Sequence, residues 1–302
     1  MKTWHYALLV FIGGCSFGIL STFVKLAYSA GYVMAEVTGS QVLFGTLIIW
    51  MVTIFTKKKK VSLNQTLKIM LAGIPMGLTG LLYYQSLQTL DASLAIIFLF
   101  QFIWIGTLIE WVYYKRIPSS GKVLSIVILL SGSILAAGFL GESVQSLSWQ
   151  GVIWGLLSAF TFSLFIFFSS IIGNHVPAVQ KSALFSTGAL IITFLLFPPV
   201  FLIDVPTLVG VMPYGLILGI FGVVLPPLFF SIGMPHVGPS LGTILTASEL
   251  PVAIIMSAFV LSEDVGQLQW LGVALILGGI VIGNLKRKKD AGTLKSLSKL
   301  SV

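Results

Sequence analysis

One acidic residue is the first candidate for chemistry because it lies deep inside a long apolar segment. Glu249 falls about ten residues into the run from Ser240 to Leu261, and a charge at that depth of a bilayer costs roughly 3 kcal/mol on insertion scales. A carboxyl group there can exchange protons or bind a cationic group of a ligand. Pro251, two residues later, lacks an N–H and leaves backbone carbonyls unpaired nearby. The sequence thus predicts a coupling or binding role for Glu249, and a protonated structural glutamate that hydrogen-bonds across helices is the alternative.

Other polar and aromatic side chains in apolar segments are candidates for the same pocket. Gln101 falls at the depth of Glu249 in an earlier run, where its amide could read a carboxylate or an amine, or join two helices. Aromatic side chains beside a few polar groups are typical of small-molecule sites, although tyrosine and tryptophan also favour membrane interfaces and serine often serves helix packing. The remaining candidate lining residues are Tyr83, Tyr84, Gln85, Trp104, Trp154 and Ser158.

Prolines mark candidate hinges. The adjacent Pro226 and Pro227 are expected to break their helix inside the membrane, and irregular backbone there is tolerated only beside protein or a water-filled cavity. We therefore predict that Pro226, Pro227 and Pro251 are hinge or cavity-wall positions.

Catalytic and metal chemistry find no support in the sequence. Cys15 is the single cysteine, and no Cys/His group has metal-ligand spacing. There is no HExxH motif, no GxSxG motif with suitable partners, no closely paired carboxylates in apolar segments and no GxxxxGK[ST] phosphate loop. We expect no catalytic residue, metal or cofactor. A membrane-embedded enzyme acting on a lipid-linked substrate is the main alternative, and a channel or receptor is a third class.

The elements that must position these residues are membrane-spanning helices. Hydrophobic residues make up 57% of the 302 residues and charged residues 9%, far from a soluble domain. The apolar runs are 18 to 26 residues long, which suits a helix crossing a bilayer, and they lack the alternation of barrel strands. The ten predicted spans are Trp4–Leu26, Tyr32–Phe55, Leu67–Thr89, Ser93–Tyr113, Val123–Gly141, Gly151–Ile172, Ala178–Ile203, Tyr214–Gly233, Ser240–Leu261 and Leu268–Leu285.

The positive charges indicate orientation. The net charge is +8, but the basic residues form short blocks between apolar runs, such as 57–60 and 286–289, which argues for the positive-inside rule and against nucleic-acid binding. Of the 17 Lys and Arg residues, only Lys25 falls toward the outer side. We expect a multi-pass protein of the cytoplasmic membrane with both termini in the cytoplasm.

The two halves of the chain repeat. Their spans align with an offset of about 137 to 148 residues, and five spans per half is an odd number, so the second half enters the bilayer inverted. The predicted units are residues 1–145, residues 146–286 and a basic cytoplasmic tail at 287–302. The matching positions are Gly14 and Gly18 with Gly151 and Gly155, Gly73 and Gly77 with Gly215 and Gly219, and Ser93 and Leu94 with Ser240 and Leu241.

Local motifs carry a family resemblance. Residues 81–87 and 91–95 look like the passage from a third to a fourth helix, whereas 247–252, 261–263 and 271–279 look like a ninth and tenth helix. On these motifs the chain resembles the drug/metabolite transporter superfamily, specifically proteins with two EamA-type repeats. The first half departs from the pattern, with Ile103-Trp104 where a proline is usual and Lys115-Arg116 near the usual Gly-Glu exit.

The resemblance implies a secondary transporter that works by alternating access. Its substrate would be a small polar metabolite, most often an amino acid or related compound, and export would be the favoured direction. Its partners would be that small molecule, protons and the lipid bilayer. Oligomeric state, substrate identity and the choice between proton coupling and facilitated diffusion stay open at the level of the sequence.

Overall fold

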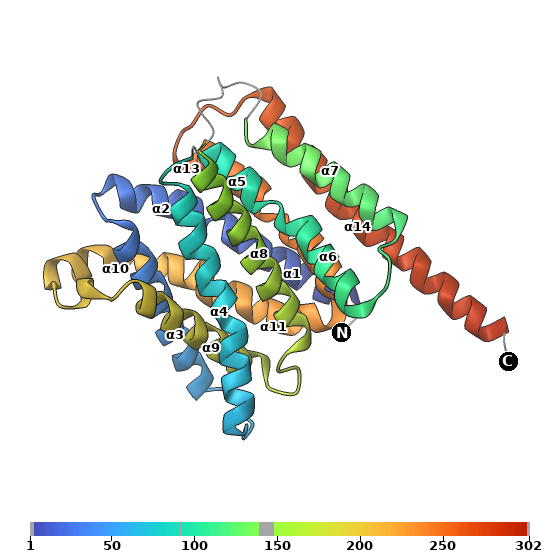
Figure 1. Ribbon diagram of the computed structural model, residues 1–302, viewed down its shortest axis with the longest axis horizontal. Coiled ribbons are helices and arrows are strands. Elements are labelled where there is room, and N and C mark those ends of the chain that lie inside the picture. Colours follow the sequence, from blue (N-terminus) through green and yellow to red (C-terminus); the bar gives the residue numbers. More distant parts are fainter. Residues whose placement is uncertain (1–2, 91, 139–147, 301–302) are drawn as a thin grey trace.

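The chain folds as a bundle of α-helices (Figure 1). The computed structural model describes residues 3–90, 92–138 and 148–300, and within these ranges it contains helices and no strand. The first half forms α1 (Thr3–Gly18), α2 (Leu20–Ser29), α3 (Met34–Ile54), α4 (Leu63–Ser86), α5 (Ala92–Leu99), α6 (Phe102–Tyr114) and α7 (Ser120–Ala136). The second half forms α8 (Trp149–Ile171), α9 (Ala178–Leu196), α10 (Val205–Gly219), α11 (Leu225–Val237), α12 (Pro239–Thr246), α13 (Glu249–Val260) and α14 (Gln267–Leu300).

These helices confirm the predicted all-α membrane architecture of ten spans. Nine stretches of the described chain are long and apolar enough to cross a membrane, and α7 is a shorter apolar helix of 17 residues. Several spans consist of two helices in succession, namely α1 with α2, α5 with α6, and α12 with α13. The last residues of the fifth predicted span and the predicted boundary at 145/146 lie outside the described residues.

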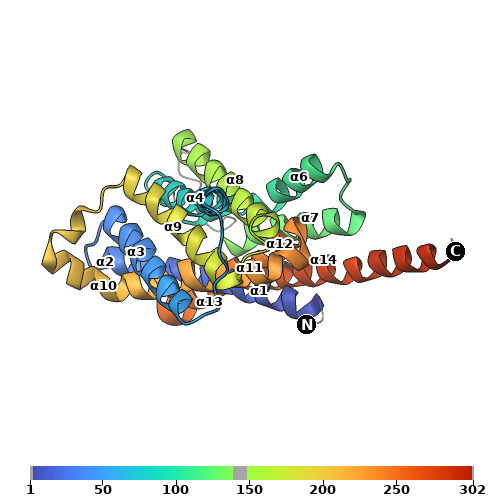
Figure 2. The same cartoon turned by 90° about the horizontal axis from the view of Figure 1, so that it is seen from below.

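The main contacts between a helix of one half and a helix of the other have counterparts in which the two halves are swapped. The pair α4 and α9 joins the third span to the seventh, and α3 and α10 join the second to the eighth. Likewise α8 packs on α4 and α6 as α1 packs on α11 and α13. The fifth and tenth spans, α7 and α14, pack on each other and lie side by side along one edge of the bundle (Figures 1 and 2). A rotation that swaps the halves requires this pattern, so the fold is two inverted five-helix repeats.

Glycines set the distance between the α4 and α9 helices. A Cβ atom added at Gly188 would lie 1.8 Å from the Met70 carbonyl oxygen, and one at Gly73 would lie 2.1 Å from the Phe185 carbonyl oxygen. Small residues let helix backbones approach in this way in membranes, where van der Waals packing drives association. The two backbones are therefore in direct contact at these points.

Both the fourth and the ninth spans are interrupted at equivalent positions. The fourth breaks at Phe100 and Gln101, and the ninth breaks at Ala247 and Ser248. Pro251 explains the second break, because its ring cannot donate the hydrogen bond that the Ala247 carbonyl would accept in a continuous helix.

The fourth span reaches the same broken form without a proline. The side-chain amide of Gln101 donates to the Ile97 carbonyl at 3.0 Å, and the Ser163 hydroxyl of α8 donates to the Phe102 carbonyl at 3.0 Å. Side chains thus satisfy carbonyls at a broken helix, as buried backbone groups require.

The expectation that Pro226 and Pro227 break their helix is wrong. The stretch Val205–Val237 is continuous, with a π-helical turn at Ile220–Val224 directly before α11. Prolines are tolerated in the first turn of α11, and the wider turn takes up their rings. Pro227 has no N–H for the Val223 carbonyl, which instead accepts a hydrogen bond from the Ser186 hydroxyl at 3.2 Å.

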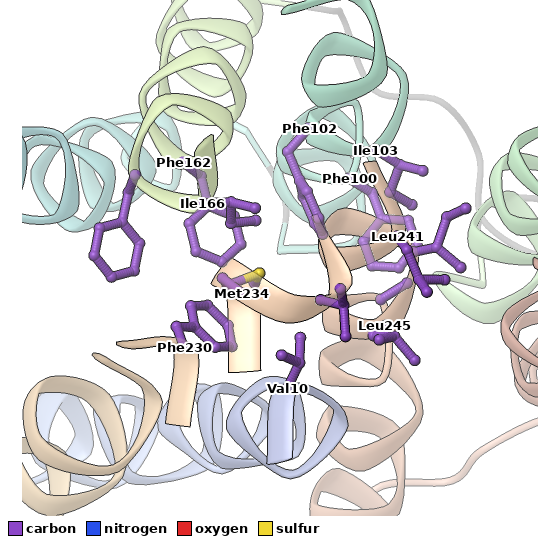
Figure 3. Packing of buried hydrophobic residues seen from close by; sticks show 14 of the residues in the cluster. Val10, Phe100, Phe102, Ile103, Phe162, Ile166, Phe230, Met234, Leu241 and Leu245 are labelled. Carbon is purple, nitrogen blue, oxygen red and sulfur yellow. The ribbon is translucent and has the colours of Figure 1, made fainter. Parts of the chain in front are cut away.

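A large apolar cluster closes the middle of the bundle. Phe102 and Phe162 pack with ring centroids 4.8 Å apart and steep mutual tilt, and Figure 3 shows them above Met234 and Phe230, with Val10 of α1 below. All five side chains are buried. Because these residues come from α1, α6, α8 and α11, the cluster joins the two halves next to the break in the ninth span.

Candidate functional site

A cavity of about 470 Å³ lies between the two halves, within the usual range for small-molecule sites. Most of its wall comes from the first half, and α8, α9, α13 and the π-helical turn of the second half complete it. The polar residues on its wall are Ser21, Lys25, Tyr28, Thr38, Gln41, Thr79, Tyr83, Tyr84 and Glu249.

Glu249 supplies a carboxyl group to this cavity. It is the first residue of α13, directly after the break in the ninth span. Helix α1 packs closely there, since a Cβ atom at Gly18 would lie 2.3 Å from the Glu249 carbonyl oxygen. The side-chain Oε2 atom is buried and has no hydrogen-bond partner among the described residues. Such an atom costs free energy until a proton or a ligand satisfies it.

Aromatic rings form much of the wall near Glu249. Tyr83 and Tyr84 of α4 both line the cavity, with ring centroids 6.0 Å apart. Phe17 of α1 and Phe162 of α8 also line it and meet nearly at right angles, with centroids 5.4 Å apart. Aromatic faces next to a carboxylate favour the cationic group of a ligand.

Two polar residues of α3 line the cavity and were not among the predicted site residues. Thr38 and Gln41 are buried, with 3% and 9% of their surface exposed. Their spacing of three residues places them on the same helix face. That spacing inside the predicted span Tyr32–Phe55 is the signal that would have found them. Packing between helices, which the sequence does not display, decides that this face meets the cavity.

An ion pair lies at the exposed end of the cavity. Lys25 of α2 lines the cavity, and its ammonium donates to Glu263 at 2.9 Å. The Ser257 hydroxyl also donates to the Glu263 carboxylate. The hydrogen bond from Ser257, and after it the one from Lys25, hold the pKa of the Glu263 carboxyl below its ordinary value. The pair joins the first span to the segment after the ninth and occupies the charge of Lys25.

The remaining predicted site residues lie elsewhere. Gln101 accepts a hydrogen bond from the Trp104 indole at 2.7 Å, and Trp104 is 40% exposed on the outside of the bundle. Gln85 donates to Gln88, and the Ser158 hydroxyl donates to its own helix at Gly155. The other predicted residues outside the cavity wall are Trp154, Pro226, Pro227 and Pro251. Of the eight predicted binding residues, the structure therefore brings Glu249, Tyr83 and Tyr84 together.

A second buried ionisable side chain lies away from the cavity. Lys181 of α9 is 1% exposed and donates to the Ser169 carbonyl at 2.8 Å and to the Asn174 side chain at 2.9 Å. Ser169 belongs to the last turn of α8, where carbonyls lack helical donors. Lys181 thus stabilises the end of α8.

Comparison with known proteins agrees with this architecture. The profile of the EamA-like transporter family matches residues 4–138 and 149–285. A relative from Bacillus subtilis (strain 168), described as "Uncharacterized transporter YwfM", is 25% identical over 197 residues, and the match spans 64% of each chain. A solved structure described only as "Crystal structure of protein" superposes with a TM-score of 0.74 at 16% identity over 93% of this chain and 98% of that one, which shows a shared fold. The two family matches cover both halves of the bundle, and the chain belongs to the EamA-like transporter family.

Proposed function

We propose that this multi-pass membrane protein is a secondary transporter for small polar metabolites that carry an amine, most of all amino acids and related compounds. The observation that carries the proposal is the unsatisfied carboxyl oxygen of Glu249 in a cavity between two inverted repeats. A carboxyl group with aromatic neighbours suits an ammonium group, and the cavity volume suits a small molecule.

Alternating access is the mechanism that the packing supports. The cavity extends from Glu249 to Lys25 and Tyr28, whose side chains reach the surface. Phe162 lines the cavity and packs in the apolar cluster with Phe102 and Met234 (Figure 3), so this cluster closes the cavity on that side. Because the halves pack in exchangeable pairs, opening at the opposite end needs only that each half adopt the arrangement of the other.

Export and proton coupling are part of the same proposal. The charge asymmetry of the loops supports an orientation in the cytoplasmic membrane with the Lys25 end outside and both termini in the cytoplasm. A proton and an ammonium group would compete for the Glu249 carboxyl, so protons entering from outside would release an amine there. If one proton exchanges for one substrate, a difference of one pH unit alone, without a membrane potential, sustains about a tenfold substrate gradient.

The test is flux of a labelled amino acid in liposomes that contain the purified protein and an imposed pH gradient. We expect gradient-driven accumulation with the wild-type protein and loss of the gradient dependence with Glu249→Gln. Glu36→Gln is the matched control, since this carboxyl lies outside the cavity wall and accepts a hydrogen bond from the Val33 N–H, which a glutamine oxygen can also accept. Full gradient-driven flux in Glu249→Gln would show that the coupling assignment is wrong.

A further inference from the structure

The cavity has a second polar group of side chains on α3, separate from Glu249. The Thr38 hydroxyl oxygen is buried without a hydrogen-bond partner among the described residues. The side-chain amide of Gln41 likewise makes no hydrogen bond within the described part of the chain. A buried hydroxyl is almost always paired, so the unpaired Thr38 oxygen, on the same helix face as a Gln41 amide that is open to the cavity, indicates a partner that binds and leaves.

The position of Gln41 is defined by a glycine of the second half. The Gln41 amide nitrogen lies 2.5 Å from where a Cβ atom at Gly222 would be, and the Leu20 side chain lies 3.0 Å from the same point. Leu20 is the first residue of α2, and Gly18 is the last residue of α1. Gly18 contacts Glu249, so Gln41 and Glu249 lie next to the two ends of this join between the helices. The two polar groups therefore flank the same join and face one cavity.

The chemistry of the two groups is complementary. Glu249 contributes a carboxyl, whereas the Thr38 hydroxyl and the Gln41 amide can donate hydrogen bonds without carrying charge. The lysine of the cavity wall, Lys25, is held by Glu263. Neutral donors in a low-dielectric cavity can bind a carboxylate without the cost of burying a cation.

Resting on the function proposed above, we infer that Thr38 and Gln41 bind the carboxylate of the substrate while Glu249 binds its ammonium group. The site then recognises an amino acid zwitterion. An amine that lacks the carboxylate leaves the two donors unpaired, and an unpaired buried donor weakens binding. Thr38 and Gln41 are thus specificity-determining residues of the transporter.

The inference is tested with matched ligands and purified full-length protein in detergent. One set is L-leucine, 3-methylbutylamine and 4-methylpentanoate, which keep one side chain and drop the carboxylate or the amine. The second set is L-phenylalanine, 2-phenylethylamine and 3-phenylpropanoate. Dissociation constants come from ligand-dependent shifts in thermal unfolding. We expect the wild-type protein to bind the amino acid about tenfold or more tightly than its amine, the usual effect of a hydrogen bond to a charged group.

The variants separate the two groups. Thr38→Val and Gln41→Met, which conserve volume, should weaken amino acid binding about tenfold each and leave amine binding unchanged. Gly222→Ala should act like Gln41→Met, because its Cβ displaces the end of the Gln41 side chain most and meets Leu20 only at 3.0 Å, where a small shift of that flexible side chain suffices. Gly278→Ala is the control, since a Cβ there also meets nothing within 4 Å and Gly278 lies outside the cavity wall.

Each result has a distinct meaning. If Thr38→Val and Gln41→Met weaken the amine as much as the amino acid, or weaken neither, the carboxylate assignment is wrong. In that case gradient-driven flux that depends on Glu249 would still uphold the transporter. Failure of every compound to bind the wild-type protein would overturn both the amino acid class and the carboxylate assignment.

Discussion

The contact between α4 and α9 makes a quantitative prediction for Gly188→Ala. The new Cβ would lie 1.8 Å from the Met70 carbonyl oxygen, whereas ordinary contact begins at 3.4 Å, so the backbones must separate by roughly 1.6 Å. The obstacle is backbone, and no rotamer change removes it. Overpacking a core costs about 1 to 3 kcal/mol, and a contact with backbone belongs at the upper end of that range.

The higher helix propensity of alanine offsets part of this cost. Alanine is better than glycine inside a helix by about 1 kcal/mol, so we expect a net loss of about 2 kcal/mol in the free energy of unfolding. For a chain of 302 residues that corresponds to about 3 °C in the midpoint of thermal unfolding. The measurement is thermal unfolding of the purified protein in detergent, followed by tryptophan fluorescence.

Gly278→Ala provides the comparison for this measurement. A Cβ at Gly278 meets nothing within 4 Å, so the substitution keeps the helix benefit without the clash and should be neutral or stabilising. A Gly188→Ala protein as stable as Gly278→Ala would refute the direct backbone contact between α4 and α9.

Two further predictions concern stability. Ser257 and Lys25 lower the pKa of Glu263. At mildly acidic pH the folded protein therefore binds fewer protons at this carboxyl than the unfolded chain does. The resulting stability is present above the ordinary carboxyl pKa of 4.5 and is lost as the pH falls through the lowered pKa. Thermal unfolding of Glu263→Gln across that window should show less acid destabilisation than the wild-type protein, and an unchanged pH profile would contradict it. Ser186→Ala removes the hydroxyl hydrogen that the Val223 carbonyl shares with the Ser182 carbonyl, so we expect a loss of up to about 1 kcal/mol in denaturant unfolding, and no loss would mean that the hydrogen lies on Ser182 or that the Val223 carbonyl has another partner.

The sequence predicts those features that depend on the composition of a single segment. Apolar length and basic loops predict the ten spans, the inverted repeat and the depth of Glu249, because hydropathy and loop charge can be read from each segment of the sequence by itself. The family resemblance predicted from local motifs is confirmed by matches to both halves.

Other properties depend on packing and were not predictable. Gln101 shares the depth of Glu249, yet its amide bonds its own helix at Ile97, since a break there leaves a carbonyl to satisfy. In the sequence, Thr38 and Gln41 are ordinary polar residues of a span. Only the structure shows that Gln41 packs against Gly222 of the π-helical turn. Which face of a helix meets the cavity is decided by the helices that pack against it, and the residues of that helix alone do not reveal it.

The unlike breaks in the fourth and ninth spans make the two repeats mechanically unequal. In the ninth span the Pro251 ring leaves the Ala247 carbonyl without its helical donor, whatever the surrounding side chains do. In the fourth span the interruption is accompanied by hydrogen bonds from the Gln101 amide and the Ser163 hydroxyl, so it depends on two side chains. One repeat therefore has an interruption that comes from its backbone chemistry and the other has one that depends on side-chain contacts, although the two repeats share one architecture.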